Sequence, residues 1–208
     1  ELPPDLDSLA AALHLFVRCA PQYIKLCMEP THLALLQAGA GVPETWILAP
    51  SDPPSLRAAM QRGIDRYWGG GVDVDVCAHF FLVLMTFNTK SFAEPVAAGI
   101  RYISAAQHKD GHWDAKWYWC PYYVGALCLE LLSRAAPHIP ALERATNFLL
   151  KTQREDGGWG IRESVPLDTA HALWNLARMD IERHRPVIDR GLSLLLEHQV
   201  SDGSWNPA

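Results

Sequence analysis

Two helical patterns of apolar and polar residues alternate along the second half of the chain. In the first pattern, apolar residues recur three and four positions apart with charged residues between them, as in a helix with one face in solvent. Three segments follow it: residues 97–107, 142–153 and 187–199. The second pattern is apolar over most of its length and indicates buried helices, at residues 75–87, 122–134 and 168–179. No strand-like alternation occurs, so the pattern predicts an all-α chain.

The first third of the chain follows the same patterns less regularly. Residues 7–18 are typical of an apolar inner helix, and residues 56–68 of an outer helix that ends at the glycine run 69–71. Between them, residues 40–54 contain four prolines, which favours an irregular excursion.

A short sequence, Gln-x-x-Asp-Gly-x-Trp, closes each of the partly polar helices. It begins at Gln107, Gln153 and Gln199, so successive copies are 46 residues apart. The Gly after Asp is suited to the left-handed backbone that ends a helix. A repeat of this length built from helical pairs predicts two concentric rings, an α/α toroid or barrel. Four to five pairs are visible, fewer than a complete barrel needs, and we expect one domain over residues 1–208.

Composition excludes several classes of protein. Of 208 residues, 49% are hydrophobic and 20% charged, which excludes a disordered chain. The net charge of −5 and the scattered basic residues argue against a nucleic-acid partner. No apolar run is long enough to span a bilayer. The odd number of cysteines without a C-x-x-C pair predicts reduced, buried thiols in a cytoplasmic protein, whose oligomeric state stays open. These are Cys19, Cys27, Cys77, Cys120 and Cys128.

The repeated turn resembles the QW motif of squalene–hopene cyclases, a motif with a structural role. Further stretches resemble, in the same order, motifs of the bacterial class II diterpene cyclases. They are Asp5-Leu6-Asp7-Ser8, Cys77-Ala78-His79, Asp114-Ala115-Lys116-Trp117 with Pro121-Tyr122-Tyr123, and the last repeat from Thr152 to Ala170. The resemblance implies a class II terpene cyclase that protonates and cyclises a linear C15 or C20 prenyl diphosphate through a carbocation, without ionising the diphosphate.

By this resemblance Asp7 is the proton donor and Asp5 its supporting partner. Two adjacent carboxyls in a dry cavity suit this chemistry, because one can stay protonated while hydrogen bonds stabilise the base left behind. The sequence departs from the family at Ser8-Leu9, where relatives carry Asp-Asp or Thr-Thr. The residues alone leave a second interpretation open, in which Asp7 and Ser8 only cap the helix that follows.

The resemblance also implies a substrate-binding set. Lys116 lies where a cation would meet the diphosphate, with Mg²⁺ as an expected aid, and His79 belongs to the Asn-Ala-His-like segment. Aromatic faces stabilise carbocations, and five aromatic residues fall on or next to the inner elements. They are Trp117, Trp119, Tyr122, Tyr123 and Trp174. The residues alone leave other interpretations open, in which Lys116 is a solvated surface charge and the aromatic residues belong to the ordinary core. The same holds for Arg57, Arg62 and Arg66, which precede the glycine run, and for His14, seven residues after Asp7.

Two rival functions remain open from the sequence. Asp75-Val76-Cys77 resembles zinc ligands of protein prenyltransferases, but zinc needs further ligands such as His79 or His171 to converge, so we predict no metal and a capping role for Asp75. An enzyme on this toroid could otherwise be a zinc-dependent prenyltransferase or a cyclase of non-terpenoid chains. A repeat domain that lost its acid would be a non-catalytic binding protein.

Overall fold

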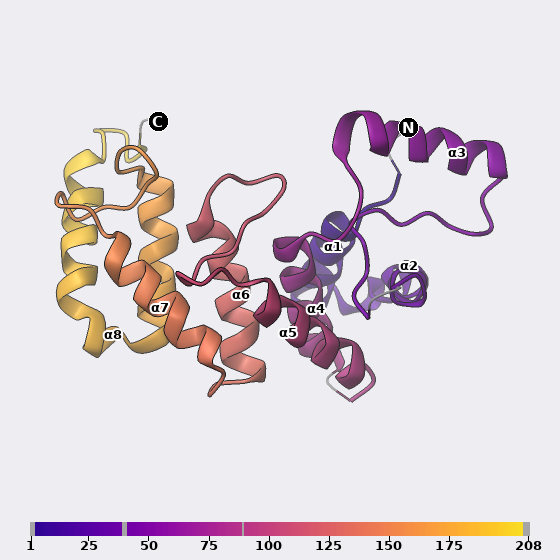
Figure 1. The fold of residues 1–208 in the computed structure, drawn as a ribbon, viewed down its shortest axis with the longest axis horizontal. Coiled ribbons are helices and arrows are strands. Elements are labelled where there is room, and N and C mark those ends of the chain that lie inside the picture. Colours follow the sequence, from indigo (N-terminus) through magenta and orange to yellow (C-terminus); the bar gives the residue numbers. More distant parts are fainter. Residues whose placement is uncertain (1–2, 39–40, 89, 206–208) are drawn as a thin grey trace. The chain divides into compact units, whose positions relative to one another are not determined.

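The computed structural model describes residues 3–38, 41–88 and 90–205, and its regular structure is helical (Figure 1). The helices are α1 (Leu6–Cys19), α2 (Lys25–Leu36), α3 (Pro54–Gly63), α4 (Val74–Asn88), α5 (Ala93–Ala106), α6 (Pro121–Ala135), α7 (Pro140–Thr152) and α8 (Pro166–His198), with the short helices η1 (Pro21–Tyr23) and η2 (Ile64–Trp68). The all-α prediction is confirmed. Within the described ranges, no helix combines the length and apolar character needed to cross a bilayer.

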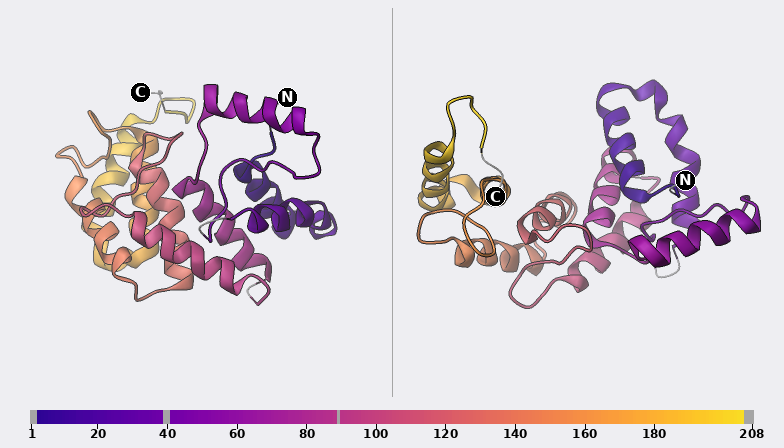
Figure 2. Two further views of the ribbon diagram at one scale, coloured as in Figure 1. Left: turned by 45° about the vertical axis from the view of Figure 1, so that its right-hand side comes forward. Right: turned by 90° about the horizontal axis from the view of Figure 1, so that it is seen from above.

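Internal contacts divide the chain into two compact units, Glu1–Ala105 and Ala106–Ala208. In the first unit α1 packs on α4, and α2 packs on α1 (Figures 1 and 2). Its core combines residues of α1 and α4 that are fully or almost fully buried: Leu6, Leu13, Phe80, Phe81 and Leu84. The prediction of one domain over residues 1–208 stays a prediction.

The loop before α3 fixes the position where α1 begins. The backbone N–H of Leu6 donates to the Thr45 carbonyl at 2.7 Å, and that of Ile47 donates to the Pro4 carbonyl at 2.9 Å. Thr45 in turn donates to Gly71 at 3.0 Å, within the glycine run. This proline-containing loop is irregular, as predicted, and it anchors the end of α1 that carries Asp5 and Asp7.

In the second unit, two of the repeated glutamines, Gln107 and Gln153, join their own turn to a backbone carbonyl of another helix. The Gln107 amide nitrogen donates to the carbonyls of Gly111 and Ala141, both at 2.9 Å. Gln153 repeats this arrangement with Gly157 and Val187, both at 2.8 Å. A side-chain amide thus satisfies backbone carbonyls of two elements at once, which gives the turn a structural role.

The glycine and tryptophan of the turn complete this arrangement. Gly111, Gly157 and Gly203 have positive φ angles of 107°, 93° and 85°, which a residue with a Cβ adopts only with strain. The Trp159 indole is fully buried and donates to the Leu149 carbonyl at 2.9 Å, and Trp205 donates to Leu195 at 2.8 Å. The 46-residue sequence repeat is therefore also a repeat of geometry.

Several boundaries differ from the sequence prediction. The predicted helices 168–179 and 187–199 belong to one element, α8, interrupted at Asp180, whose φ of −168° and ψ of 97° are not helical. The α2 helix was not predicted, because it has Pro30 inside and little amphipathic pattern. Cys19 is exposed and Cys120 partly exposed, so the prediction of buried thiols was wrong for these two cysteines.

Candidate active site

Asp5 forms the N-cap of α1. Its Oδ1 accepts a hydrogen bond from the Ser8 backbone N–H at 2.7 Å, and its Oδ2 accepts one from the Ser8 hydroxyl at 2.9 Å. The alternative interpretation, with Asp7 and Ser8 as the cap, was therefore wrong about which carboxylate caps the helix. Ser8 thus holds Asp5 in place.

Asp7 lies in the first turn of α1 and points toward α4. Its Oδ1 is 3.6 Å from His79 Nδ1. His79 Nε2 is 3.3 Å from His14 Nδ1, and His14 lies two turns along α1 from Asp7. The fold thus places a carboxyl and two imidazoles in line, from segments that are more than sixty residues apart in sequence. This line is our candidate acid site.

The surroundings of Asp7 differ from the dry cavity that the sequence interpretation requires. Its side chain is 47% exposed, whereas that of His79 is 18% exposed. A hollow of about 610 Å³ in this unit is lined by Pro3 and by residues of α3 and η2, without Asp7. Among the described residues, no hydrogen bond joins Asp5 to Asp7, because both carboxylate oxygens of Asp5 accept hydrogen bonds from Ser8. Asp7 is partly exposed because it lies on the first turn of α1 between Leu6, which is buried, and Ser8, which is exposed.

A buried pair of carboxyls lies at the start of α4. Asp73 and Asp75 are both buried. Burial, followed by a hydrogen bond to Asp73 and its charge, raises the pKa of Asp75 to about 7. Burial and the two nearby carboxyls raise the pKa of Cys77 to about 12. Asp75 lies inside the first helical turn and Asp73 precedes the helix, so the predicted capping role of Asp75 was wrong.

Two predicted substrate-binding residues share a hollow in the second unit. Lys116 and Trp119 line a depression of about 490 Å³ together with His112, Asp114 and Ile161, among others. Trp119 is 88% exposed, so a large aromatic surface is available there.

The other predicted aromatic residues do not line this hollow. Tyr122 is buried and stacks on Phe148 with ring centroids 5.8 Å apart, so it belongs to the core. Tyr123 packs edge-on against His171 at 5.4 Å. Trp174 is 58% exposed, with the Arg178 guanidinium 5.7 Å from its ring, and Trp117 is partly buried. These aromatics therefore do not form one continuous wall with Trp119.

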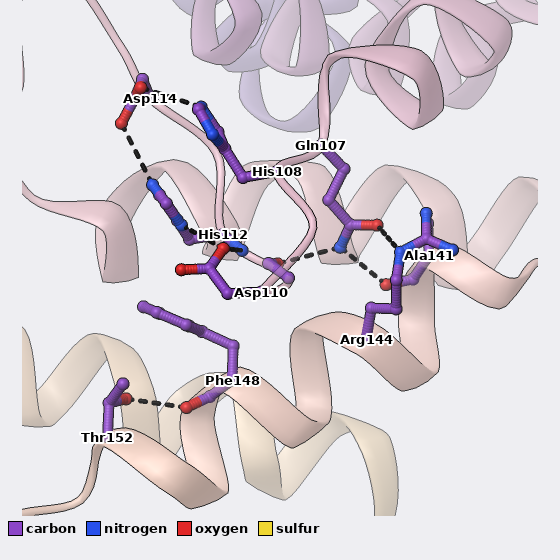
Figure 3. Close-up of polar contacts among 10 residues, drawn as sticks. Gln107, His108, Asp110, His112, Asp114, Ala141, Arg144, Phe148 and Thr152 are labelled. Atoms are coloured by element: carbon purple, nitrogen blue, oxygen red, sulfur yellow. Dashed lines mark hydrogen bonds and ion pairs between the residues drawn. The ribbon is translucent and has the colours of Figure 1, made fainter.

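Sequence reasoning missed a cluster in the first repeated turn, made of His108, His112 and Asp114 (Figure 3). Each of these three side chains offers one atom that could bind a metal ion, and the three atoms lie within 4.8 Å of one another. The zinc interpretation of Asp75 and Cys77 finds no such convergence there. Two imidazoles and one carboxylate do not suit Mg²⁺, which prefers oxygen ligands, and the expected help of Mg²⁺ in diphosphate binding stays a prediction.

The helical pairs and their turns define a class of fold, that of the class II terpene cyclases. The type II terpene cyclase MstE from Scytonema superposes with a TM-score of 0.71 at 22% identity, over 99% of this chain and 58% of MstE. Residues 71–207 match the squalene-hopene cyclase C-terminal domain. The chain belongs to this family.

Several curated relatives are bacterial diphosphate synthases. Labda-7,13-dienyl diphosphate synthase of Streptomyces clavuligerus is 37% identical over 106 residues, 48% of this chain and 19% of the relative. Terpentedienyl-diphosphate synthase of Kitasatospora griseola is 40% identical over 76 residues, 35% of this chain and 15% of the relative. The matched segments thus span less than a fifth of each relative.

Proposed function

We propose that this chain carries the acid of a class II terpene cyclase and acts on a linear prenyl diphosphate of C15 or C20 length. The observation that carries the proposal is the line Asp7–His79–His14, with distances of 3.6 Å and 3.3 Å. It unites the two segments that resemble the acid and Asn-Ala-His motifs, in a chain whose family is the squalene-hopene cyclase C-terminal domain.

In the proposed reaction the protonated Asp7 carboxyl transfers its proton to a carbon of the terminal alkene. The alkene's π electrons form the new C–H bond, and a tertiary carbocation remains. Neighbouring double bonds then attack in turn, each closing a ring, until loss of a proton forms the final alkene. The diphosphate group stays bonded to the carbon chain throughout, so the product is an isomer of the substrate.

His79 and His14 would act on the base that Asp7 becomes after it gives up its proton. An imidazole N–H beside a carboxylate stabilises the negative charge, and this lowers the cost of releasing the proton. His14 would fix the ring of His79 from its other side. Asp5 would act indirectly, since its bonds to Ser8 hold the helical turn that presents Asp7.

Lys116 is proposed as a cation that binds a diphosphate group, as its resemblance to the Asp-Lys-Trp segment implies. This cation is exposed and shares a hollow with Trp119, where an isoprenoid chain could pack on the aromatic ring. A variant of MstE has been solved with geranylgeranyl dihydroxybenzoate, named as its substrate. A relative with this fold therefore binds a C20 chain without a diphosphate, so the test includes both kinds of substrate.

The test is incubation with farnesyl diphosphate, geranylgeranyl diphosphate or geranylgeranyl dihydroxybenzoate, followed by product analysis after dephosphorylation. We expect a cyclic isomer from a diphosphate, and we expect Asp7→Asn to lower the rate by at least about 100-fold. Glu155→Gln removes an exposed carboxyl of the second unit and should leave the rate unchanged. A folded Asp7→Asn protein that cyclises at the native rate would refute the assignment of Asp7 as the acid. Turnover of geranylgeranyl dihydroxybenzoate but of neither diphosphate would refute the proposal that the substrate is a prenyl diphosphate.

A further inference from the structure

The three repeated turns share one backbone geometry but differ in the side chains that it brings together. In each turn, the backbone N–H just after the glutamine donates to a carbonyl four residues later, at 2.9 Å every time. The turn therefore places two residues opposite each other, whatever their side chains. The facing pairs are His108 with His112, Arg154 with Gly158, and Val200 with Ser204. The first turn alone, among these three, presents two imidazoles.

The imidazoles of His108 and His112 stack with ring centroids 4.4 Å apart and planes 8° from parallel. Both rings contact the carboxylate of Asp114, each at a different oxygen (Figure 3). His108 Nε2 is 2.9 Å from Asp114 Oδ2, and His112 Nε2 is 3.3 Å from Asp114 Oδ1. Ligands of a tetrahedral ion bound at about 2.0–2.1 Å lie roughly 3.3 Å from one another, so these separations are close to those of a coordination shell.

A second carboxylate orients His112. Asp110 Oδ1 lies 2.6 Å from His112 Nδ1, and the Phe148 ring packs against the same imidazole with centroids 5.4 Å apart. When Nδ1–H donates to Asp110, the lone pair of His112 lies on Nε2, the atom that faces Asp114. A carboxylate behind a histidine in this way is the usual support of a metal-binding imidazole, because it fixes both the tautomer and the ring.

We infer that His108, His112 and Asp114 form a binding site for a divalent transition-metal cation of the Zn²⁺, Co²⁺ or Ni²⁺ type, with Asp110 as the orienting residue. Imidazole nitrogens favour these ions, whereas Mg²⁺ and Ca²⁺ favour oxygen. Three protein ligands leave at least one coordination position for water or an anionic oxygen. Because His112 and Asp114 line the hollow that contains Lys116, a bound cation adds positive charge to its wall.

The inference is tested on the full chain without a histidine tag, by calorimetric titration with Zn²⁺, Co²⁺ and Ni²⁺ at pH 7.5 and with Mg²⁺ as the comparison ion. We expect one transition-metal ion per chain and no saturable binding of Mg²⁺. The His108→Gln, His112→Gln and Asp114→Asn variants should each bind at least tenfold more weakly. Asp110→Asn should weaken binding about 10- to 100-fold while keeping the one-to-one stoichiometry, as an orienting residue does.

His138→Gln is the matched control, since His138 is an exposed histidine outside the cluster. It should bind the ion as the wild type does. Equal affinity of the wild type and all three ligand variants would overturn the inference, as would a loss of binding in His138→Gln as large as in His112→Gln. Circular dichroism of each variant confirms folding. The inference does not depend on the cyclase activity.

Discussion

Asp75 makes the stability of the chain depend on pH in a way that one substitution should remove. Asp75 is 2% exposed, its Oδ1 has no hydrogen-bond partner among the described residues, and burial with the neighbouring Asp73 raises its pKa to about 7 from an ordinary value of 3.8. The folded state therefore keeps a proton on Asp75 in a range of pH where the unfolded chain has lost it.

The sign follows from which state binds more protons. Below pH 3.8 both states are protonated, so Asp75 contributes no pH dependence. Between the two pKa values the unfolded chain loses its proton while the folded state keeps it, and the free energy of unfolding falls by about 1.4 kcal/mol per pH unit. Above about pH 7 the loss is complete and amounts to about 4 kcal/mol for a shift of this size.

The assay is urea unfolding of the wild type and Asp75→Asn at several pH values from 5 to 8. Over this range the wild type should lose about 2.5 kcal/mol relative to the variant, because asparagine does not titrate. Glu155→Gln, which removes an exposed carboxyl, should follow the wild type at every pH. A constant difference between wild type and Asp75→Asn across the range would show that Asp75 is not protonated in the folded state.

Two further predictions concern the repeated turn and the thiols. Gly111→Ala should lower the free energy of unfolding by about 3 kcal/mol or more, because a Cβ there would lie 2.1 Å from the Arg144 carbonyl oxygen at a φ of +107°. Gly203→Ala, with a similar φ but its nearest neighbouring atom at 3.9 Å, should cost about 1 kcal/mol in the same urea assay, and equal costs would refute the packing argument. Cys19 is exposed, whereas Cys77 is buried with its pKa raised to about 12, so iodoacetamide at pH 8 should alkylate Cys19 at least about 100-fold faster, as peptide mass spectrometry would show. Comparable rates at the two thiols would contradict the burial of Cys77.

Most helices could be predicted from the sequence because their signals are local. Apolar periodicity, an opening proline and a closing Asp-Gly turn delimit a helix without knowledge of its neighbours. The segment predicted at 122–134 is α6, Pro121–Ala135, and the segment predicted at 142–153 is α7, Pro140–Thr152. α2 has weak periodicity and an internal proline, so it had no such signal.

The partners of polar side chains could not be predicted in this way, because they depend on how distant segments pack. The residues alone suggested Asp7 and Ser8 as the cap, and only the register of α1 decides that Asp5 bonds to Ser8. The contact between Asp7 and His79 depends on the packing of α1 against α4. His108 and His112 meet because the turn that begins at Gln107 brings its second and sixth positions together.

The central claim is that Asp7 starts a cyclisation by donating a proton that exchanges with solvent. The most direct measurement is the deuterium content of the product formed from geranylgeranyl diphosphate in D₂O, in the wild type and in Asp7→Asn. The account predicts a cyclic diphosphate with one solvent-derived deuterium on carbon, formed by the wild type and lost in Asp7→Asn. A cyclic product without deuterium, or one formed with release of pyrophosphate, would contradict it.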